Sequence, residues 1–463
     1  MKKCIFPIFL IIFLIFSTVF APAASAYEIT GVDIRAEVAL LASYDTGEIV
    51  YSRNADKKMY PASLTKIMTA LVVLRETEDL EAEKLTVSAD ALRLISGTGS
   101  SVTGVKEGEI ITAKDALAGL LITSGGDVSY VIAEHYGGTV EGFVEKMNAL
   151  AKELGMNSTH FANPHGLHDD NHYTTANDLL KVATAAMEYP VFNEIVSASR
   201  YKMAATNLSD ERLLVTTNFL QDASTAYYYK PASGIKTGFT EKAGRCLISS
   251  AKKNGYTYIC ILMGSPWKLS TGEGVRYEFT DSKNIYEWAF ANLEYRTALS
   301  SDNAICEINV KGSFDADHIA LVPEKEFAAI LPKGTDDSTI EIKTVPLSDT
   351  VKAPINKGDV LGKAEIYYAG EKLGEVNLIA HEDLAGSGIL EILSAIGSFF
   401  TSKFFKVFII IILMIIVLIV MYVVFLNRKQ IKRKRRVTYK PYKNEGKHAR
   451  RNDDYNDFIN RYK

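Results

Sequence analysis

Three short groups of residues in this chain carry the side chains needed for acyl transfer to a serine. The first is Ser63 with Lys66 three positions later, the second begins at Ser124, and the third is Lys236-Thr237-Gly238. A serine hydroxyl attacks at neutral pH only when a base within hydrogen-bond reach removes its proton. A lysine can be that base when burial or a neighbouring cation lowers its pKa, and Lys236 is the candidate cation. The sequence therefore predicts an acyl-transfer site with Ser63, Lys66 and Ser124 as catalytic residues.

The residues around Ser63 predict a helix that places Ser63 and Lys66 together. Pro61-Ala62 favours an extended approach to the helix, and positions three apart share a helix face. The Ser-x-x-Lys spacing is not specific, because it recurs at Ser199/Lys202 and Ser249/Lys252. Taken alone, it is equally typical of a helix N-cap followed by a solvated lysine. Only Ser63 precedes apolar residues at helical spacing, which are Ile67, Ala70, Leu71 and Leu74.

The third group lies within residues 233–240, which are predicted to form a strand that begins at a turn. A glycine weakens a strand unless something approaches its backbone closely. A peptide could lie along this strand, with the Lys236 ammonium and the Thr237 hydroxyl meeting its terminal carboxylate. An ordinary surface turn is the alternative interpretation of the triplet.

Taken together, the three groups in this order resemble the motif set of the low-molecular-mass penicillin-binding proteins, the serine-type D-alanyl-D-alanine carboxypeptidases of peptidase family S11. The resemblance covers about residues 38–385, and it is carried outside the motifs by segments 40–70, 115–138, 147–167 and 173–178. It implies an α+β fold, with a helical cluster on an antiparallel sheet and the site between them, followed by a small all-β domain. It also implies that Lys236, Thr237, Gly238 and Phe239 bind substrate, with Phe239 supplying a backbone donor to the oxyanion.

Two positions depart from the family pattern. The middle motif of the family is Ser-x-Asn, whereas this chain has Gly126 at the third position. The resemblance gives that asparagine the task of orienting the substrate's carbonyl and steadying the lysine. Some relatives also place a carboxylate-binding arginine where this chain has Thr257, so that charge recognition would rest more heavily on Lys236.

The two ends of the chain carry targeting signals. Residues 1–26 read as a signal peptide, with Lys2 and Lys3, an apolar run and a small-residue cleavage site at Ala24-Ser25-Ala26. Residues 404–426 read as a transmembrane helix, because 407–426 contains no charge over the length of a bilayer core. We place a catalytic domain at 27–295, an all-β domain at 300–385, an amphipathic linker at 386–403 and a basic cytoplasmic tail at 427–463.

The distribution of charge indicates the topology and the partners. The tail holds 14 Lys/Arg against 4 Asp/Glu, while the whole chain has a net charge of −3. Positive charge marks the cytoplasmic side of a span, so the catalytic domain is expected outside the cell membrane. An acidic ectodomain argues against nucleic acid as a substrate, and the tail is better suited to anionic lipid headgroups.

The cysteines and histidines add no second chemistry. Cys246 and Cys260 flank Asn254-Gly255, a hairpin signal whose two-residue loop places them on opposite sheet faces, so no disulfide is expected between them. We expect both, and Cys306, to be small core residues. Residues 160–172 hold four histidines, but their spacing matches no compact zinc motif. We expect no metal and no cofactor.

The function that the resemblance implies is that of a membrane-anchored serine D-Ala-D-Ala carboxypeptidase. It would trim peptidoglycan stem pentapeptides through an acyl-enzyme and would be inhibited by β-lactam antibiotics. A β-lactamase is one alternative, although no deacylating base stands out. A wall-binding or scaffold protein with an impaired site is another, which Gly126 favours.

Overall fold

The computed structural model describes residues 27, 29–267 and 275–434, with side chains to residue 429. The predicted signal peptide and most of the predicted basic tail lie outside the described residues. The chain forms two compact units. One contains most of the chain up to Asp383, and the other contains Leu384 onward with two short segments, 310–317 and 352–354.

A five-stranded antiparallel sheet, in the order β2-β1-β9-β8-β7, forms the centre of the first part of the described chain. Its strands are β1 (Val38–Ser43), β2 (Ile49–Arg53), β7 (Ala232–Thr240), β8 (Gly244–Lys253) and β9 (Tyr256–Ser265). Alternate residues of β9 enter two different cores: Ile259, Ile261 and Met263 lie in the larger one, and Tyr258, Cys260 and Leu262 in the smaller one. This period of two is the expected consequence of a strand buried on both faces.

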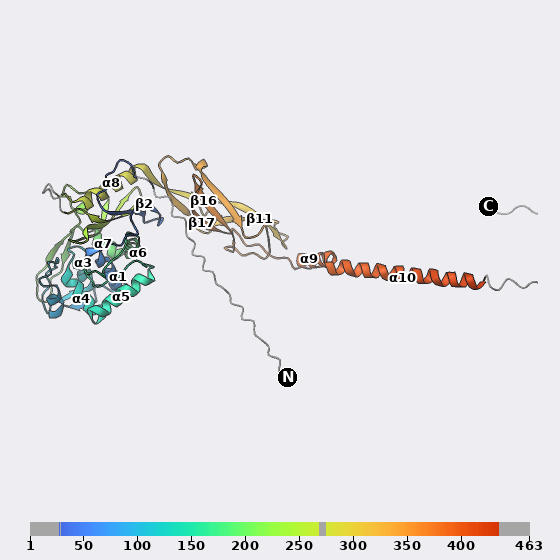
Figure 1. The fold of residues 1–463 in the computed structure, drawn as a ribbon, viewed down its shortest axis with the longest axis horizontal. Helices are drawn as coiled ribbons and strands as arrows, with labels where there is room; N and C mark the ends of the chain where they lie inside the picture. Colours follow the sequence, from blue (N-terminus) through green and yellow to red (C-terminus); the bar gives the residue numbers. More distant parts are fainter. Residues whose placement is uncertain (1–26, 28, 268–274, 435–463) are drawn as a thin grey trace, which may run out of the picture. The chain divides into compact units, whose positions relative to one another are not determined.

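Helices cover the larger core, and Figure 1 shows α1, α3, α4 and α5 grouped together in this part of the molecule. The helices are η1 (Ala62–Thr65), α1 (Lys66–Glu76), α2 (Ala89–Ile95), α3 (Ala113–Leu121), α4 (Gly126–Gly137), α5 (Val140–Glu153), α6 (Ala176–Met187) and α7 (Pro190–Ser197), whereas the short η2 (Phe219–Gln221) packs on the smaller core. Two small antiparallel two-stranded sheets accompany these helices, β3 (Lys84–Thr86) with β4 (Ile110–Thr112) and β5 (Arg200–Met203) with β6 (Arg212–Val215). Helix α8 (Tyr277–Asn292) packs on the other face of the sheet, where Phe279, Tyr286 and Phe290 enter the smaller core.

The next part of the chain is built from strands. A six-stranded sheet has the order β14-β16-β17-β12-β11-β15, and β10 pairs with β13. The bounds are β10 (Leu293–Leu299), β11 (Cys306–Lys311), β12 (His318–Pro323), β13 (Phe327–Pro332), η3 (Asp337–Thr339), β14 (Ile340–Pro346), β15 (Thr350–Lys352), β16 (Val360–Tyr368) and β17 (Glu371–Ala380). The predicted fold class, a helical cluster on an antiparallel sheet followed by an all-β domain, is confirmed.

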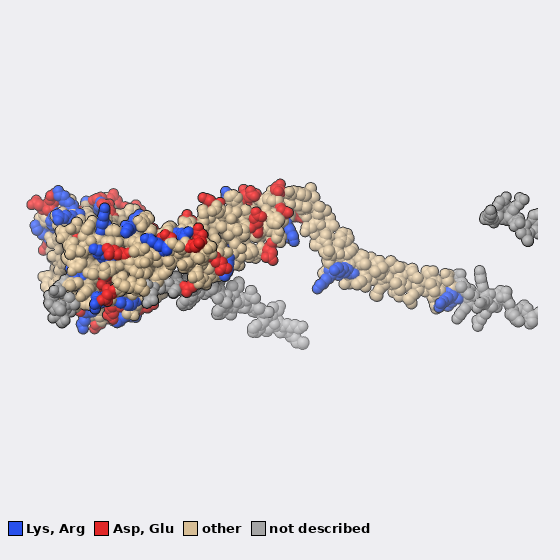
Figure 2. Space-filling view, turned by 90° about the horizontal axis from the view of Figure 1, so that it is seen from above, with Lys and Arg blue, Asp and Glu red and all other residues tan. Residues whose placement is uncertain are grey.

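Two helices end the described chain, α9 (Gly388–Thr401) and α10 (Lys403–Lys434). Among the described residues, one helical stretch, Lys403–Lys429, is long and apolar enough to cross a membrane. Figure 2 shows the apolar length of this helix as a continuous tan surface with blue Lys and Arg groups at its two ends. The apolar side chains predicted to recur along α9 are exposed, as shown by Ile389, Ile392 and Leu393.

The predicted positions of Cys246 and Cys260 are confirmed, whereas that of Cys306 is not. The hairpin of β8 and β9 turns at Asn254 and Gly255, both with positive φ, as a two-residue turn requires. Cys246 lies in the larger core and Cys260 in the smaller one, and both are free and buried. The prediction that Cys306 is a core residue is wrong, because this side chain at the start of β11 is only partly buried.

Candidate active site

Ser63 lies in a short 3-10 turn, η1, and α1 begins only at Lys66. The predicted α-helix therefore starts three residues later than the serine. Side chains three positions apart eclipse each other in a 3-10 turn, which has three residues per turn. Lys66 Nζ consequently lies 3.1 Å from Ser63 Oγ. This is the distance that a nucleophile and its base require.

Lys66 is completely buried behind Ser63, and its ammonium group has few partners. Nζ donates a hydrogen bond to the backbone oxygen of His165 at 2.6 Å. Burial lowers the pKa of Lys66 from 10.5 to about 7, against the opposing charge of Asp127. Of the two causes that we expected, burial lowers the pKa of Lys66, and the charge of Lys236 is not needed. A substantial fraction of Lys66 is a neutral amine at neutral pH.

Lys236 is buried in the middle of β7, and its Nζ donates to the backbone oxygen of Thr237 at 3.0 Å. Burial first, and then the charge of Lys66, hold its pKa well below the usual 10.5. The Thr237 hydroxyl lies 2.6 Å from the hydroxyl of Thr217. A carboxylate that binds here would favour the protonated form of Lys236.

Strand β7 runs close to the nucleophile turn because Gly238 has no side chain. A Cβ added at Gly238 would lie 3.1 Å from Pro61 O and 3.2 Å from Ser63 N. Gly166 makes a second close approach, with φ at +89° and a hypothetical Cβ only 1.8 Å from Ala62 O. The two glycines therefore let β7 and the segment after His165 close around Ser63.

The backbone is strained beside the nucleophile and at the second motif. Ala62 has φ at 48° and Ser124 has φ at 62°, the left-handed region that residues with a Cβ seldom adopt. Such residues cluster at functional sites, where the surrounding structure holds them in place. Ser124 is nearly buried at the start of α4, where it faces the cleft.

A cleft of about 400 Å³ opens over these groups. Of the predicted site residues, Ser63, Ser124, Thr237, Gly238 and Phe239 line it, while Lys66 and Lys236 lie buried beneath its surface. Its other lining residues are Gly99, Ser100, Ser101, His165, Gly166, Leu167, Thr216, Thr217, Phe219, Thr240 and Arg276. The cleft thus unites three segments that are far apart in the sequence.

Two of the four clustered histidines support the site from behind. His165 accepts a hydrogen bond at Nδ1 from Leu167 N, and its Nε2 lies 2.7 Å from Tyr130 Oη. His172 accepts at Nδ1 from Ala162 N. Burial lowers the pKa of His165 to about 3 and that of His172 to about 4, so both stay neutral at physiological pH. Within the described ranges, no three His, Cys, Asp or Glu side chains form a group that could hold a metal.

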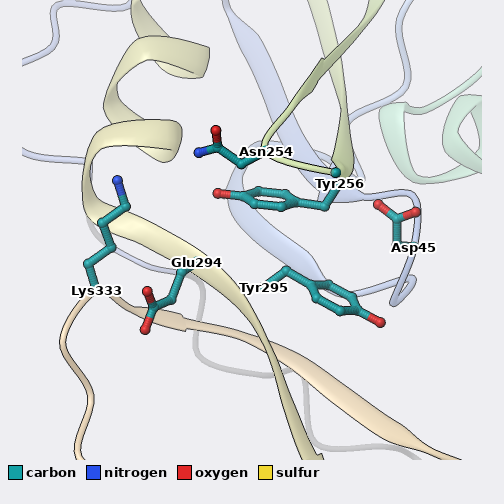
Figure 3. A pocket seen from close by; sticks show the side chains of 7 residues that line it. Asp45, Asn254, Tyr256, Glu294, Tyr295 and Lys333 are labelled. Atoms are coloured by element: carbon teal, nitrogen blue, oxygen red, sulfur yellow. The ribbon is translucent and has the colours of Figure 1, made fainter.

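The expectation that Thr257 marks the carboxylate-binding position is wrong. Thr257 lies at the turn end of the β8–β9 hairpin, where its backbone nitrogen donates to Asp45 at 2.6 Å. This end borders a different cavity, in which Tyr256 and Tyr295 lie between Asp45 on one side and Glu294 and Lys333 on the other (Figure 3). None of the predicted site residues lines that cavity.

Arg276 is a cation at the cleft that no sequence pattern predicted to be a site residue. It lines the cleft, with its guanidinium 4.8 Å from the ring centroids of both Phe219 and Phe279. Its Nε donates to the buried carboxylate of Glu278 at 2.6 Å. No motif surrounds it in the sequence, and only the folding of α8 onto the sheet brings it to the cleft.

Comparison with known proteins identifies the family. The family model described as D-alanyl-D-alanine carboxypeptidase, peptidase family S11, matches residues 22–266. The chain belongs to this family. It is accordingly a serine-type hydrolase. A second family model, the C-terminal domain of penicillin-binding protein 5, matches residues 294–385.

Several members of the S11 family resemble the chain over most of its length. The D-alanyl-D-alanine carboxypeptidase DacF of Bacillus subtilis is 32% identical over 362 residues, covering 77% of this chain and 88% of that protein. Penicillin-binding protein 5 of Haemophilus influenzae has a similar solved structure, with 28% identity, a TM-score of 0.65, and coverage of 77% of this chain and all of that one. The DD-transpeptidase of Streptomyces K15 has a TM-score of 0.52 at 29% identity, covering 57% of this chain and all of that one.

Proposed function

We propose that this protein is a membrane-anchored D-Ala-D-Ala carboxypeptidase that removes the terminal D-alanine from peptidoglycan stem pentapeptides through an acyl-enzyme on Ser63. The observation that carries the proposal is the 3.1 Å separation of Ser63 Oγ from the buried Lys66 Nζ. A buried amine with a pKa of about 7 can be neutral before substrate arrives and can accept the proton of Ser63 as it attacks.

The reaction takes two steps. Ser63 Oγ attacks the carbonyl carbon between the two D-alanines, and its proton passes to Lys66 Nζ. The C–N bond then breaks, and a proton reaches the leaving amine through the hydroxyl of Ser124. Water next attacks the resulting ester, which releases the shortened peptide and restores the Ser63 hydroxyl.

Strand β7 supplies the binding groups for the peptide. The substrate lies along β7, with its terminal carboxylate at Lys236 and Thr237. The backbone N–H groups of Ser63 and Phe239 form the oxyanion hole, which stabilises the tetrahedral intermediate. β-Lactams offer a carbonyl and a carboxylate in a similar relation, so they acylate the same serine.

The C-terminal helices anchor the enzyme in the membrane. Helix α10 crosses the bilayer, and the basic residues that follow its apolar stretch, beginning with Arg428 and Lys429, hold that end in the cytoplasm. Helix α9 exposes isoleucines, leucines and phenylalanines, and it lies at the outer surface of the membrane. The catalytic domain is then extracellular, where its substrate is found.

A second candidate, a wall-binding protein with an impaired site, is favoured by Gly126 alone. The family's asparagine at this position offers a carboxamide to the site, which glycine does not. The direct test separates the two functions: the full chain in detergent is incubated with a stem pentapeptide, and mass spectrometry follows the loss of one alanine. We expect turnover by the native chain and none by Ser63→Ala. A folded native chain that binds the peptide but releases no alanine would favour the scaffold.

A further inference from the structure

The space beside Gly126, where the family carries a side chain, is already filled in this protein. Gly126 is the first residue of α4 and has ordinary helical backbone geometry. A Cβ built on it would lie 2.6 Å from Ser100 Oγ and 2.6 Å from Ile95 Cδ1. A hydroxyl oxygen from a different segment therefore lies within contact distance of the place where the first side-chain atom of residue 126 would be.

Hydrogen bonds hold the segment that carries Ser100 against the start of α4. Gly126 N donates to the backbone oxygen of Ser101 at 2.8 Å. The buried carboxylate of Asp127 accepts hydrogen bonds from Thr103 N and Gly104 N, both at 2.8 Å. These bonds involve Gly126 and Asp127, which directly follow Ser124 and Gly125 in the chain. They therefore fix the position of Ser100 relative to the second motif.

Ser100 lines the cleft, and its hydroxyl has no hydrogen-bond partner among the described residues. Ser100 is half-buried and lines the cleft together with Ser63 and Ser124. A serine hydroxyl can donate one hydrogen bond and accept two, so it can pair with either a peptide N–H or a peptide carbonyl.

We propose that Ser100 is a substrate-binding residue whose hydroxyl hydrogen-bonds to the backbone of the peptide substrate, in place of a side chain at position 126. This inference rests on the proposed carboxypeptidase function. The substrate backbone would lie between two walls of the cleft, with β7 supplying Thr237 on one wall and the 99–101 segment supplying Ser100 on the other. The missing carboxamide is thus replaced by a hydroxyl from elsewhere in the chain.

The first test removes the hydroxyl. Ser100→Ala in the full chain should lower kcat/KM for the pentapeptide about 10-fold, the usual effect of losing one hydrogen bond in a binding site. The melting temperature should stay close to that of the native chain, because the hydroxyl has no partner within the protein. Ser96→Ala, in the same segment but exposed and outside the cleft, is the matched control. Native kcat/KM in Ser100→Ala would overturn the proposal.

The second test moves the hydroxyl to position 126. Ile95→Val removes Cδ1 and Ser100→Gly removes Oγ, which are the two atoms that would clash with a side chain on residue 126. In this double variant we expect the loss seen in Ser100→Ala, and adding Gly126→Ser should recover at least a third of the kcat/KM of Ile95→Val alone. A loss that the transplanted hydroxyl does not reverse would mean that Ser100 only packs the segment.

The outcomes also separate this inference from the function on which it rests. A native chain that releases D-alanine while Ser100→Ala does so equally well refutes only the role of Ser100. A native chain that releases no D-alanine refutes the proposed carboxypeptidase and, with it, the role of Ser100.

Discussion

Gly238 in strand β7 faces Ser63 so closely that a Cβ at position 238 would lie 3.2 Å from the Ser63 nitrogen. This proximity makes β7 one wall of the site. It also places the backbone after Gly238 where it can act together with Ser63 N–H on a developing oxyanion.

Gly238→Ala should therefore slow acylation of Ser63 by β-lactams about 100-fold, because a methyl group would push β7 away from the nucleophile turn. The measurement is the rate of labelling by a fluorescent penicillin. Gly397→Ala is the control, since its Cβ would meet nothing within 4 Å. A Gly238→Ala variant that is labelled within threefold of the native rate would contradict this geometry.

The pH dependence of acylation should report the base. Lys66 must be neutral to accept the proton of Ser63, and burial lowers its pKa to about 7. The acylation rate should rise about tenfold per pH unit below pH 7 and level off above it. His165 and His172 cannot produce this limb, because their pKa values of about 3 and about 4 lie too low. A rate that is flat from pH 5 to 9 would exclude Lys66 as the base.

Lys66→Met should abolish activity and stabilise the fold. The lysine pKa is about 7 in the folded protein and 10.5 when the side chain is solvated, so burial costs about 5 kcal/mol below neutral pH. Loss of the hydrogen bond to His165 O offsets part of this cost. We expect a net gain on the order of 2 kcal/mol in the free energy of unfolding at pH 7.

The pH dependence of the free energy of unfolding tests whether Lys66→Met stabilises the fold for this reason. Between pH 7 and 10.5, unfolded Lys66 holds a proton that folded Lys66 lacks, so native stability rises with pH. The advantage of Lys66→Met should shrink over that range in urea titrations. Lys242→Met, at an exposed lysine, should show no such trend. A variant less stable than the native chain at every pH would contradict the account.

Gly126→Asn alone should not improve the enzyme, although it restores the family motif. Its side chain would collide with Ser100 Oγ and Ile95 Cδ1, each 2.6 Å from the Cβ position. Both atoms end rotatable side chains, so the overlap would turn the Ser100 hydroxyl out of its position at a cost of about 1 kcal/mol, the low end for overpacking. Melting temperature and D-alanine release should both fall. A rise in activity without a loss of stability would show that the 99–101 segment accommodates the asparagine side chain at little energetic cost.

The sequence predicted those features that depend on local pattern or on motif order. The Asn254-Gly255 turn and the apolar face after Ser63 are local signals, and both appear in the structure. The three groups in family order predicted that Ser63, Ser124 and Thr237 meet in one cleft. Their spatial convergence follows from the fold, which the family resemblance supplied.

Features that depend on long-range packing were missed or misplaced. Ser100 and Arg276 reach the cleft only because the segment before β4 and the start of α8 pack beside it. Thr257 was placed by its alignment with the family pattern, and the structure puts it beside the cavity at the turn end of the β8–β9 hairpin, away from the cleft. Burial and the charge of Lys236 were both expected to lower the pKa of Lys66, and burial alone accounts for the lowering, because it depends on the packing of the whole core.

The most direct test of the central claim is peptide mass mapping of the full chain after brief exposure to penicillin at pH 8. The account predicts one covalent penicilloyl group on Ser63, no adduct in Ser63→Ala, and a strongly slowed adduct in Lys66→Met. A stable adduct on another residue, or undiminished labelling of Ser63 without the Lys66 amine, would contradict it.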